Sequence, residues 1–470
     1  MAPVSDLAPE TKPAETPEVA VGLDTSLVEA VVAALAAGDA EAAARLIEPL
    51  HAADTADLLQ GLDNDQRRLL LGVISKELLP AVLPELDDTV RDDIIAELGL
   101  AETAAAVADL ETDDALLVIS DLDAEDQKLV LAAMPPPDRA LIAQALAYPE
   151  YSAGRLMQRE LVALPLFWTV GETIDHLRQT AEHDADLLPT AFYDVFVVDP
   201  KHRPVGSLSL SRLIRARRQV PLSALMQTDL KVLRTTTDQE DVAFLFRQRD
   251  LTSAPVVDEG GRLVGVVTID DVVDVIDEEH EDDIMHLGGV SEDDFYRASF
   301  ATARARFTWL LVNLGTAVLA SAVIGLFDAT IEQMVALAVL MPIVASMGGN
   351  AGTQTLTVAV RALATKQLTP TNALRVISKE TMVGFVNGII FAVITGTVAW
   401  LWFDNLGLGV VIGLAMVVNL LVAGLSGVVI PLILDWRGID PAVASSVFLT
   451  TLTDVIGFFA FLGLGTWLLL

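Results

Sequence analysis

The sequence predicts a multidomain protein: an all-α superhelical N-terminal domain, an α/β tandem pair of domains, an acidic connecting helix and an α-helical transmembrane bundle of five spans. Three observations predict it. Apolar runs long enough to cross a membrane occur only after Arg304. The excess of 35 negative charges lies entirely before that residue, because the chain from Arg304 onward holds seven acids and seven bases. Between the acidic start and the membrane half, one strand–helix unit occurs twice.

The first 150 residues divide into a tail and a helical domain. Residues 1–24 are rich in Pro, Glu and Thr and predict a disordered tail. Residues 25–150 show a weak repeat of 24 residues, with QGLDND at 60, PELDDT at 84 and ADLETD at 108, and with SDLDAE at the half-spacing, at 120. Since Asp is a preferred first residue of helices, the repeat predicts stacked short helices, each capped by an Asp.

Residues 151–275 contain the duplication. FYDVFVVDPKHRPVGSLSLSRLI at 192–214 and LTSAPVVDEGGRLVGVVTIDDVV at 251–273 each predict a buried strand, a turn with Gly, a second strand and a helix. TTTDQEDVAFLF fits the helix before the strands of the second copy. The segment resembles a tandem CBS pair, and such pairs commonly bind adenosine nucleotides. The resemblance implies ATP or another adenosine nucleotide as a ligand at Thr268 and Asp271, whereas the first copy has Ser209 with Arg212 in place of the Asp.

Residues 276–303 are expected to form an acidic plug or connecting helix. The stretch IDDVVDVIDEEHEDDIMHLGG places nine acids between Asp270 and Asp283. Like charges four residues apart destabilise a helix by a few tenths of a kcal/mol each. The run is therefore either a solvated acidic face or a gating helix that cations neutralise, and its position directly before the first span favours gating.

The transmembrane domain, residues 304–470, contains five apolar runs. They cover 307–327, 333–360, 381–403, 405–434 and 442–470, and the last is apolar except for Asp454. About 20 helical residues cross the hydrocarbon core, so each run is one crossing, tilted or broken where the run is long.

The short loops predict the orientation. Lys and Arg residues occur before spans one, three and five, all on one side of the membrane, and the other two loops contain none. The positive-inside rule therefore predicts a multi-pass protein of the cytoplasmic (inner) membrane with the N-terminus cytosolic and the C-terminus outside. The first apolar run begins at residue 307, so no N-terminal signal peptide is expected, and the absence of cysteine suits a cytosolic soluble half. The lipid bilayer is an expected partner and nucleic acid is not.

Asp454 is the main candidate for ion chemistry. A carboxylate near mid-bilayer costs at least ~2.5–3.5 kcal/mol and usually faces a bundle interior or a water-filled cavity. It could be a protonated side chain in an inter-helix hydrogen bond, but nearby hydroxyls favour an ion path. Hard cations such as Mg²⁺ take oxygen ligands and keep several waters. The candidates for lining such a path are Gly348, Gly349, Asn350, Gly352 and Gln354 in the second span and Thr450, Thr451 and Thr453 in the fifth.

The parts and their order resemble the MgtE family of magnesium channels over residues 25–470. GGNAGTQ at 348–354 and DPAVASSVFLTTLTDVIG at 440–457 match its second-span and last-span motifs, and EDDIMHLGG at 281–289 matches the end of its plug helix. The resemblance implies a homodimer with the pore on the two-fold axis, and Asp454 as the pore carboxylate.

The resemblance also implies regulatory Mg²⁺ bound between the N-domain, the CBS pair and the plug. The matching positions are Asp113, Asp238, Glu240, Asp250, Asp271, Asp274, Glu279, Asp282 and Asp283. Two further acids of the family pattern fall on Ala81 and Leu117 here, and Arg247 replaces a small residue.

The sequence therefore predicts a Mg²⁺-selective, channel-like importer that cytosolic Mg²⁺ closes. Two alternatives stay open. A proton-coupled carrier of Co²⁺ or Mn²⁺ would show a strict pH dependence of uptake. A CBS-based nucleotide sensor on a membrane anchor would bind adenosine nucleotide and move no ion. No enzyme is expected, because the six His residues form no nucleophile–base motif and cysteine is absent.

Overall fold

The computed structural model describes residues 22–183, 188–189, 191–290 and 299–470. These residues form two compact units, one made of residues up to 237 with 253–267 and the other of 238–252 with 268–470. The predicted disordered tail, 1–24, lies outside the described residues except for its last three.

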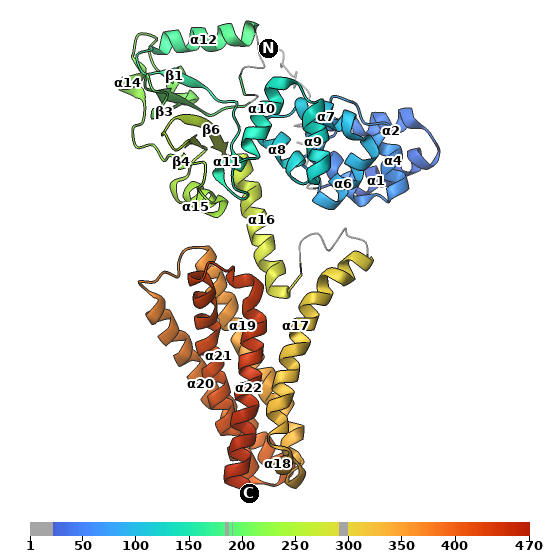
Figure 1. Cartoon of the computed structure of the whole chain (residues 1–470), viewed down its shortest axis with the longest axis vertical. Coiled ribbons are helices and arrows are strands. Elements are labelled where there is room, and N and C mark those ends of the chain that lie inside the picture. The colour runs from blue at the N-terminus through green and yellow to red at the C-terminus, as the bar shows by residue number, and fades with distance from the viewer. Residues whose placement is uncertain (1–21, 184–187, 190, 291–298) are drawn as a thin grey trace, which may run out of the picture. The chain divides into compact units, whose positions relative to one another are not determined.

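The N-terminal domain is a stack of short helices (Figure 1). They are α1 (Thr25–Ala36), α2 (Ala40–Ile47), α3 (Ala52–Gly61), α4 (Asn64–Leu71), α5 (Leu79–Val82), α6 (Asp88–Leu98), α7 (Leu100–Ala108), α8 (Thr112–Ser120), α9 (Ala124–Ala133) and α10 (Pro136–Ala145). The predicted caps are present at three of the four repeat positions. Asp63, Asp87 and Asp123 each accept a hydrogen bond from a backbone N–H in the first turn of α4, α6 and α9. The fourth position is Glu111, which makes no such bond before α8.

Two buried arginines also follow the 24-residue repeat, and the sequence analysis did not predict them. The Arg67 guanidinium donates to the carbonyl oxygens of Leu59 and Leu62, at 3.1 and 3.3 Å. Arg91 lies 24 residues later and repeats this pattern with the carbonyls eight and five residues before it, at 3.1 and 2.5 Å. Each arginine thus satisfies carbonyl oxygens at the end of one helix and holds the next helix against it.

The tandem α/β part has the predicted duplicated architecture. In the first copy α11 (Ala153–Leu156) precedes β1 (Ala163–Pro165), α12 (Val170–His183), β2 (Asp194–Val198), β3 (Pro204–Ser209), α13 (Leu210–Arg215) and α14 (Leu222–Leu225). β2 lies between β1 and β3, parallel to β1 and antiparallel to β3. The second copy has β4 (Leu233–Arg234), α15 (Gln239–Arg249), β5 (Ser253–Val257) and β6 (Leu263–Thr268), with the strand order β4-β5-β6. β2 and β3 lie in the first aligned sequence segment and β5 and β6 in the second, whereas β1 and β4 precede these segments.

The helix predicted after the second strand of the second copy and the acidic connecting helix are one element. α16 runs from Ile269 to Gly288, so the expected domain boundary at 275/276 falls inside it. It starts there because Thr268 and Asp271 form a capping box directly after β6. It ends with Gly289 in the left-handed conformation, φ 71°. Part of the expected 276–303 segment, residues 291–298, lies outside the described residues.

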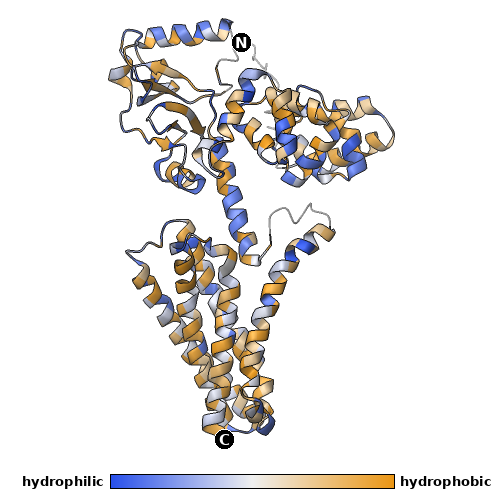
Figure 2. Cartoon of the chain, in the orientation of Figure 1, coloured by the Kyte–Doolittle hydropathy of each residue, from blue (hydrophilic) through white to orange (hydrophobic). Residues whose placement is uncertain are grey.

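The membrane half contains the five predicted spans. They are α17 (Ser299–Gly325), α19 (Ala336–Ala364), α20 (Ala373–Phe403), α21 (Leu406–Trp436) and the part of α22 (Pro441–Leu469) from residue 445 onward. The hydropathy colouring shows that the membrane helices are mostly hydrophobic and that α16 is largely hydrophilic (Figure 2). The two long runs are each one continuous helix, with Pro342 inside α19 and Pro431 inside α21. A short helix, α18 (Asp328–Gln333), precedes the second span and was not predicted.

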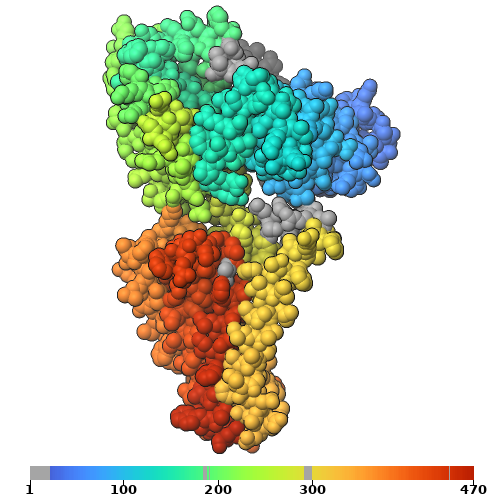
Figure 3. All heavy atoms as spheres, in the orientation of Figure 1, coloured from blue at the N-terminus to red at the C-terminus, as the bar shows by residue number. Residues whose placement is uncertain are grey.

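α21 is the central helix of this bundle. Its buried side chains form one apolar cluster with residues of α19 and α22, including Leu340, Met416 and Phe461. α17 lies beside α22 at the edge of the bundle (Figure 3). Most of its side chains are exposed, as expected for a helix in contact with lipid. The helix that carries Asp454 therefore packs against three other spans.

Candidate functional site

Asp454 lies in the middle of α22 and its side chain is partly exposed. The hydroxyl groups of the three candidate threonines around it donate hydrogen bonds to the backbone of the same helix. Thr450, Thr451 and Thr453 donate to the carbonyl oxygens of residues four positions earlier, at 2.9, 2.6 and 3.1 Å. Each oxygen keeps lone pairs as an acceptor. Thr450 is exposed and Thr453 is fully buried, so of these two Thr450 is the better placed to accept from the water shell of a cation.

The second-span motif divides between two faces of α19. Gly348 and Gly352 are buried against Asn419 of α21 and Leu449 of α22. Asn350 and Gln354 lie on the exposed side, and Gly349 is partly exposed. The glycines therefore allow close helix packing, while the two amides can meet solvent or an ion.

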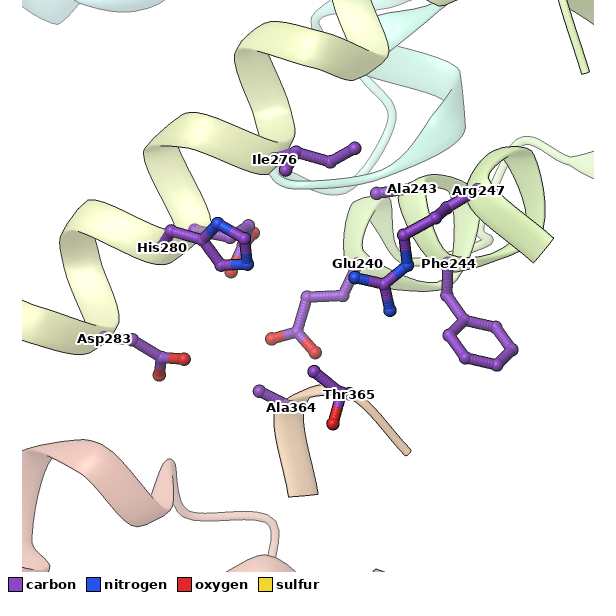
Figure 4. A pocket seen from close by; sticks show the side chains of 10 residues that line it. Glu240, Ala243, Phe244, Arg247, Ile276, His280, Asp283, Ala364 and Thr365 are labelled. Atoms are coloured by element: carbon purple, nitrogen blue, oxygen red, sulfur yellow. The ribbon is translucent and has the colours of Figure 1, made fainter. Parts of the chain in front are cut away.

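The second unit also contains an acidic pocket, near the C-terminal end of α19 (Figure 4). Its walls come from α15, α16 and the residues at the end of α19. The lining residues are Glu240, Ala243, Phe244, Arg247, Ile276, Glu279, His280, Asp283, Ala364 and Thr365. Three carboxylates from two helices that are separate in sequence thus surround one cavity.

Burial and the charges of neighbouring carboxylates raise the pKa values of these three side chains. Desolvation, followed by the charges of Glu279 and Asp238, raises the pKa of Glu240 to about 7, although its side chain keeps contact with solvent. Desolvation and the charges of Asp440 and Glu279 raise the pKa of Asp283 to about 6. The pKa of Glu279 is also raised, by desolvation first, and a hydrogen bond of 2.8 Å from Gln239 opposes this rise. The ionised cluster is therefore short of positive charge, the condition in which a divalent cation binds.

Basic side chains occupy the rim of the pocket. Lys366, directly after α19, forms an ion pair with Asp241 of α15. Its Nζ also lies 5.3 Å from the ring centre of Phe244, a cation–π distance. Arg247 lies over the same ring at 5.9 Å. Lys366 adopts a left-handed backbone, φ 54°, which turns the chain after α19. No feature of the sequence predicts that this loop residue meets α15.

The other predicted regulatory residues have local roles in the structure. Asp238 caps α15 by accepting from the N–H of Glu240 at 2.9 Å, and Asp250 ends that helix in the left-handed region, φ 52°. Asp271 accepts from the Thr268 hydroxyl at 2.7 Å in the capping box of α16. Asp274 lies further along α16, and desolvation raises its pKa.

Two more predicted positions lie apart from these. Asp282 is partly buried near the end of α16. Asp113, on α8 of the first unit, accepts from the N–H of Asp114 at 3.0 Å. Across the described ranges no three His, Asp or Glu side chains are close enough to enclose a metal ion.

Asp440 was missed as a candidate. It caps α22 by accepting from the N–H of Ala442 at 2.8 Å. Its other oxygen lies 3.2 Å from Nδ1 of His286 on α16, and its charge helps to raise the pKa of Asp283. The Asp-Pro pair that opens the last-span motif was the available signal, because Asp before Pro is typical of a helix start.

Comparison with known proteins places these features in a family. Residues 341–464 match the family model of a divalent cation transporter, MgtE. Residues 50–151 match the MgtE intracellular N domain, and residues 222–278 match a CBS domain. The three matches fall on the membrane half, the helical domain and the second strand–helix copy.

Whole proteins give the same result. The magnesium transporter MgtE of Thermus thermophilus is 38% identical over 327 residues, which are 68% of this chain and 71% of that protein. The Enterococcus faecalis protein of that name is 35% identical over 308 residues, 66% of this chain and 67% of its own length. The Bacillus subtilis protein is 29% identical over 422 residues, 90% of this chain and 92% of its own length.

Solved structures are also similar to the soluble half. The cytosolic domain of the Mg²⁺ channel MgtE in complex with ATP is 33% identical, with a TM-score of 0.49, and covers 53% of this chain and 99% of that one. The soluble part of a magnesium transporter is 26% identical, with a TM-score of 0.48, and covers 54% and 98%. With five membrane helices, the N domain, the CBS domain and relatives of this identity, the chain belongs to the MgtE family of divalent cation transporters.

Proposed function

We propose that this protein imports Mg²⁺ across the cytoplasmic membrane along a path that Asp454 lines. The observation that carries the proposal is a partly exposed carboxylate in the middle of a membrane helix. About one turn before it, the exposed hydroxyl oxygen of Thr450 can accept a hydrogen bond, because its proton is donated to the carbonyl oxygen of Ser446. Such a site binds a hydrated cation through one carboxylate and through water, which suits a hard ion that gives up its water reluctantly.

Flux of the purified protein in liposomes tests this. Asp454→Ala is expected to abolish Mg²⁺ uptake while the protein remains folded and inserted, because removing a membrane carboxylate does not harm insertion. Glu332→Ala, which removes an acid from the short helix α18, is the matched control and should conduct as the wild type does. Wild-type uptake by the Asp454 variant would refute the pore assignment. Uptake that needs a proton gradient would favour the carrier alternative instead.

The second part of the proposal is regulation. Cytosolic Mg²⁺ would close the path by neutralising the acidic pocket, where Glu240 of α15 faces Glu279 and Asp283 of α16. Without the cation these carboxylates repel one another, and a bridging ion removes the repulsion. The remaining predicted positions, from Asp113 to Asp282, are proposed as further weak sites, so that several bound ions add up to a steep response.

Assembly, orientation and nucleotide binding belong to the same proposal. We propose a homodimer because the family resemblance implies one. We propose that the N-terminus lies in the cytosol and the C-terminus outside, because the loops before spans one, three and five carry the Lys and Arg residues. An adenosine nucleotide at the second CBS copy would meet Thr268 and Asp271, whose side chains already bond to each other at 2.7 Å. Calorimetric titration of the purified protein with ATP tests that part separately.

A further inference from the structure

A buried amide lies where three membrane helices meet. Asn419 of α21 is 0% exposed. Its Nδ2 donates to the carbonyl oxygen of Val344 on α19 at 2.8 Å. Its Oδ1 is buried and has no hydrogen-bond partner within the part of the chain that the structure describes.

Two glycines make room for this amide. A Cβ on Gly348 of α19 would lie 2.2 Å from Asn419 Nδ2, and a Cβ on Gly457 of α22 would lie 2.8 Å from the same atom. Both distances are shorter than any tolerated contact, so alanine does not fit at either position unless something moves. The Asn419 side chain therefore occupies the space that a side chain would need at Gly348 of α19 and at Gly457 of α22.

Stability alone does not explain an amide here. Leaving a buried hydrogen-bond acceptor unpaired costs about 1–3 kcal/mol. A leucine has nearly the same branched shape and would bury no unpaired polar atom. The amide instead determines how the helices are placed. Its one hydrogen bond fixes where α21 contacts α19, and its volume fixes how closely α22 approaches both.

The amide lies one turn from the pore carboxylate. Gly457 follows Asp454 by three residues, which is about 4.5 Å along the helix axis and about 60° around it. A displacement of α22 at Gly457 therefore moves Asp454 by a similar amount. On the other side of the amide, Gly348 is the first residue of the motif that includes Asn350 and Gln354.

We propose that Asn419 is a positioning residue for ion permeation, which sets the register of α22 on α19 and so holds Asp454 in the ion path. This inference rests on the proposed Mg²⁺ transport. Asn419 does not touch the ion, because no part of it reaches the surface of the chain.

Asn419→Leu tests the proposal, because it separates stability from function. We expect this variant to unfold at nearly the same temperature as the wild type, because the loss of an unpaired buried acceptor offsets the crowding by the larger methyl groups. In liposomes its maximal Mg²⁺ flux should fall about tenfold, and the Mg²⁺ concentration for half-maximal flux should rise. The reason is that a small displacement of the Asp454 carboxylate from the ion path weakens its contact with the ion, as small misplacements of functional groups slow enzymes. Wild-type flux and a wild-type half-maximal concentration in this variant would overturn the proposal.

A second set of variants keeps the test valid if the leucine variant fails to fold. Gly457→Ala should reduce flux by about the same factor, and adding Asn419→Ala should restore part of it, because the smaller side chain makes room for the new methyl group. Gly463→Ala, on the same helix, is the control: its Cβ would meet only Phe327, at 3.8 Å, so flux should not change. No recovery in the double variant would contradict the role of Asn419. Full conduction by Asp454→Ala would instead refute the pore assignment itself and is therefore measured alongside.

Discussion

The acidic pocket predicts a pH dependence that a single substitution should remove. Glu240 has a pKa of about 7 in the assembled pocket, against an ordinary 4.5. Between these values the assembled pocket binds more protons than the separated helices do. Its stability is therefore fully present below pH 4.5 and is lost as pH rises through 7, unless a cation replaces the proton. Glu240→Gln, which cannot ionise, should keep the pocket assembled at high pH without Mg²⁺.

The size of the effect follows from the groups around Glu240. One proton linked to assembly changes the equilibrium by at most about tenfold per pH unit. Solvent contact and the positive charge of Lys366 reduce this, so about threefold per unit is expected. Asp283, with a pKa of about 6, acts in the same direction and stays in the variant. The other facing groups are Glu279, Asp238, His280, Asp440 and His286.

Labelling of a single thiol measures this equilibrium. The chain contains no cysteine, so Ala364→Cys places a unique thiol in the pocket lining. Its rate of reaction with a maleimide in EDTA is compared with and without Glu240→Gln at the same pH, which cancels the ionisation of the thiol. The ratio should be near one at pH 4.5, should rise by about threefold per pH unit up to pH 7 in favour of faster labelling of native Glu240, should level off above pH 7, and should return to one in excess Mg²⁺. A ratio of one at every pH in EDTA would refute this account of the pocket.

Two other predictions concern stability. Arg91→Met should destabilise the N-terminal domain by about 3–5 kcal/mol, because it leaves the buried carbonyls of α5 and its loop and the carboxylate of Asp121 without their donor. Arg68→Met, which breaks only an exposed ion pair with Glu97, should change it by less than about 1 kcal/mol. Hydrogen exchange of residues 25–150 in the full chain measures both, and equal effects would contradict the role of Arg91. Gly384→Ala should lower the thermal stability of the membrane half by about 1–3 kcal/mol, because its Cβ would lie 2.4 Å from the carbonyl oxygen of Leu420 on α21. The control Gly315→Ala meets nothing within 4 Å, and an equal loss in both would show that close packing of α20 on α21 is not the cause.

The sequence by itself determined the elements and their order. Five spans, the duplicated strand–helix unit and the Asp caps of the N-terminal repeat all follow from composition and local periodicity, and the structure confirms them. These features are local, because a helix start needs only its own first turn and a span needs only a long enough apolar run. Asp454 was a candidate for the same reason: an acid inside an apolar run is unusual wherever it occurs.

Only the tertiary structure decided which residues meet. It showed that Gly348 and Gly352 serve helix packing, that Lys366 pairs with Asp241 of α15, and that Asn419 fills the space beside two glycines. Each contact joins residues tens to more than a hundred positions apart, and local periodicity carries no information about such partners. α18 was missed because it is short and lies in a loop, and the sequence did not show that the helix after β6 and the acidic connecting helix are one element, α16. A side chain's chemistry can be read from the sequence, but its role depends on the neighbour across the helix interface, which only folding brings into contact.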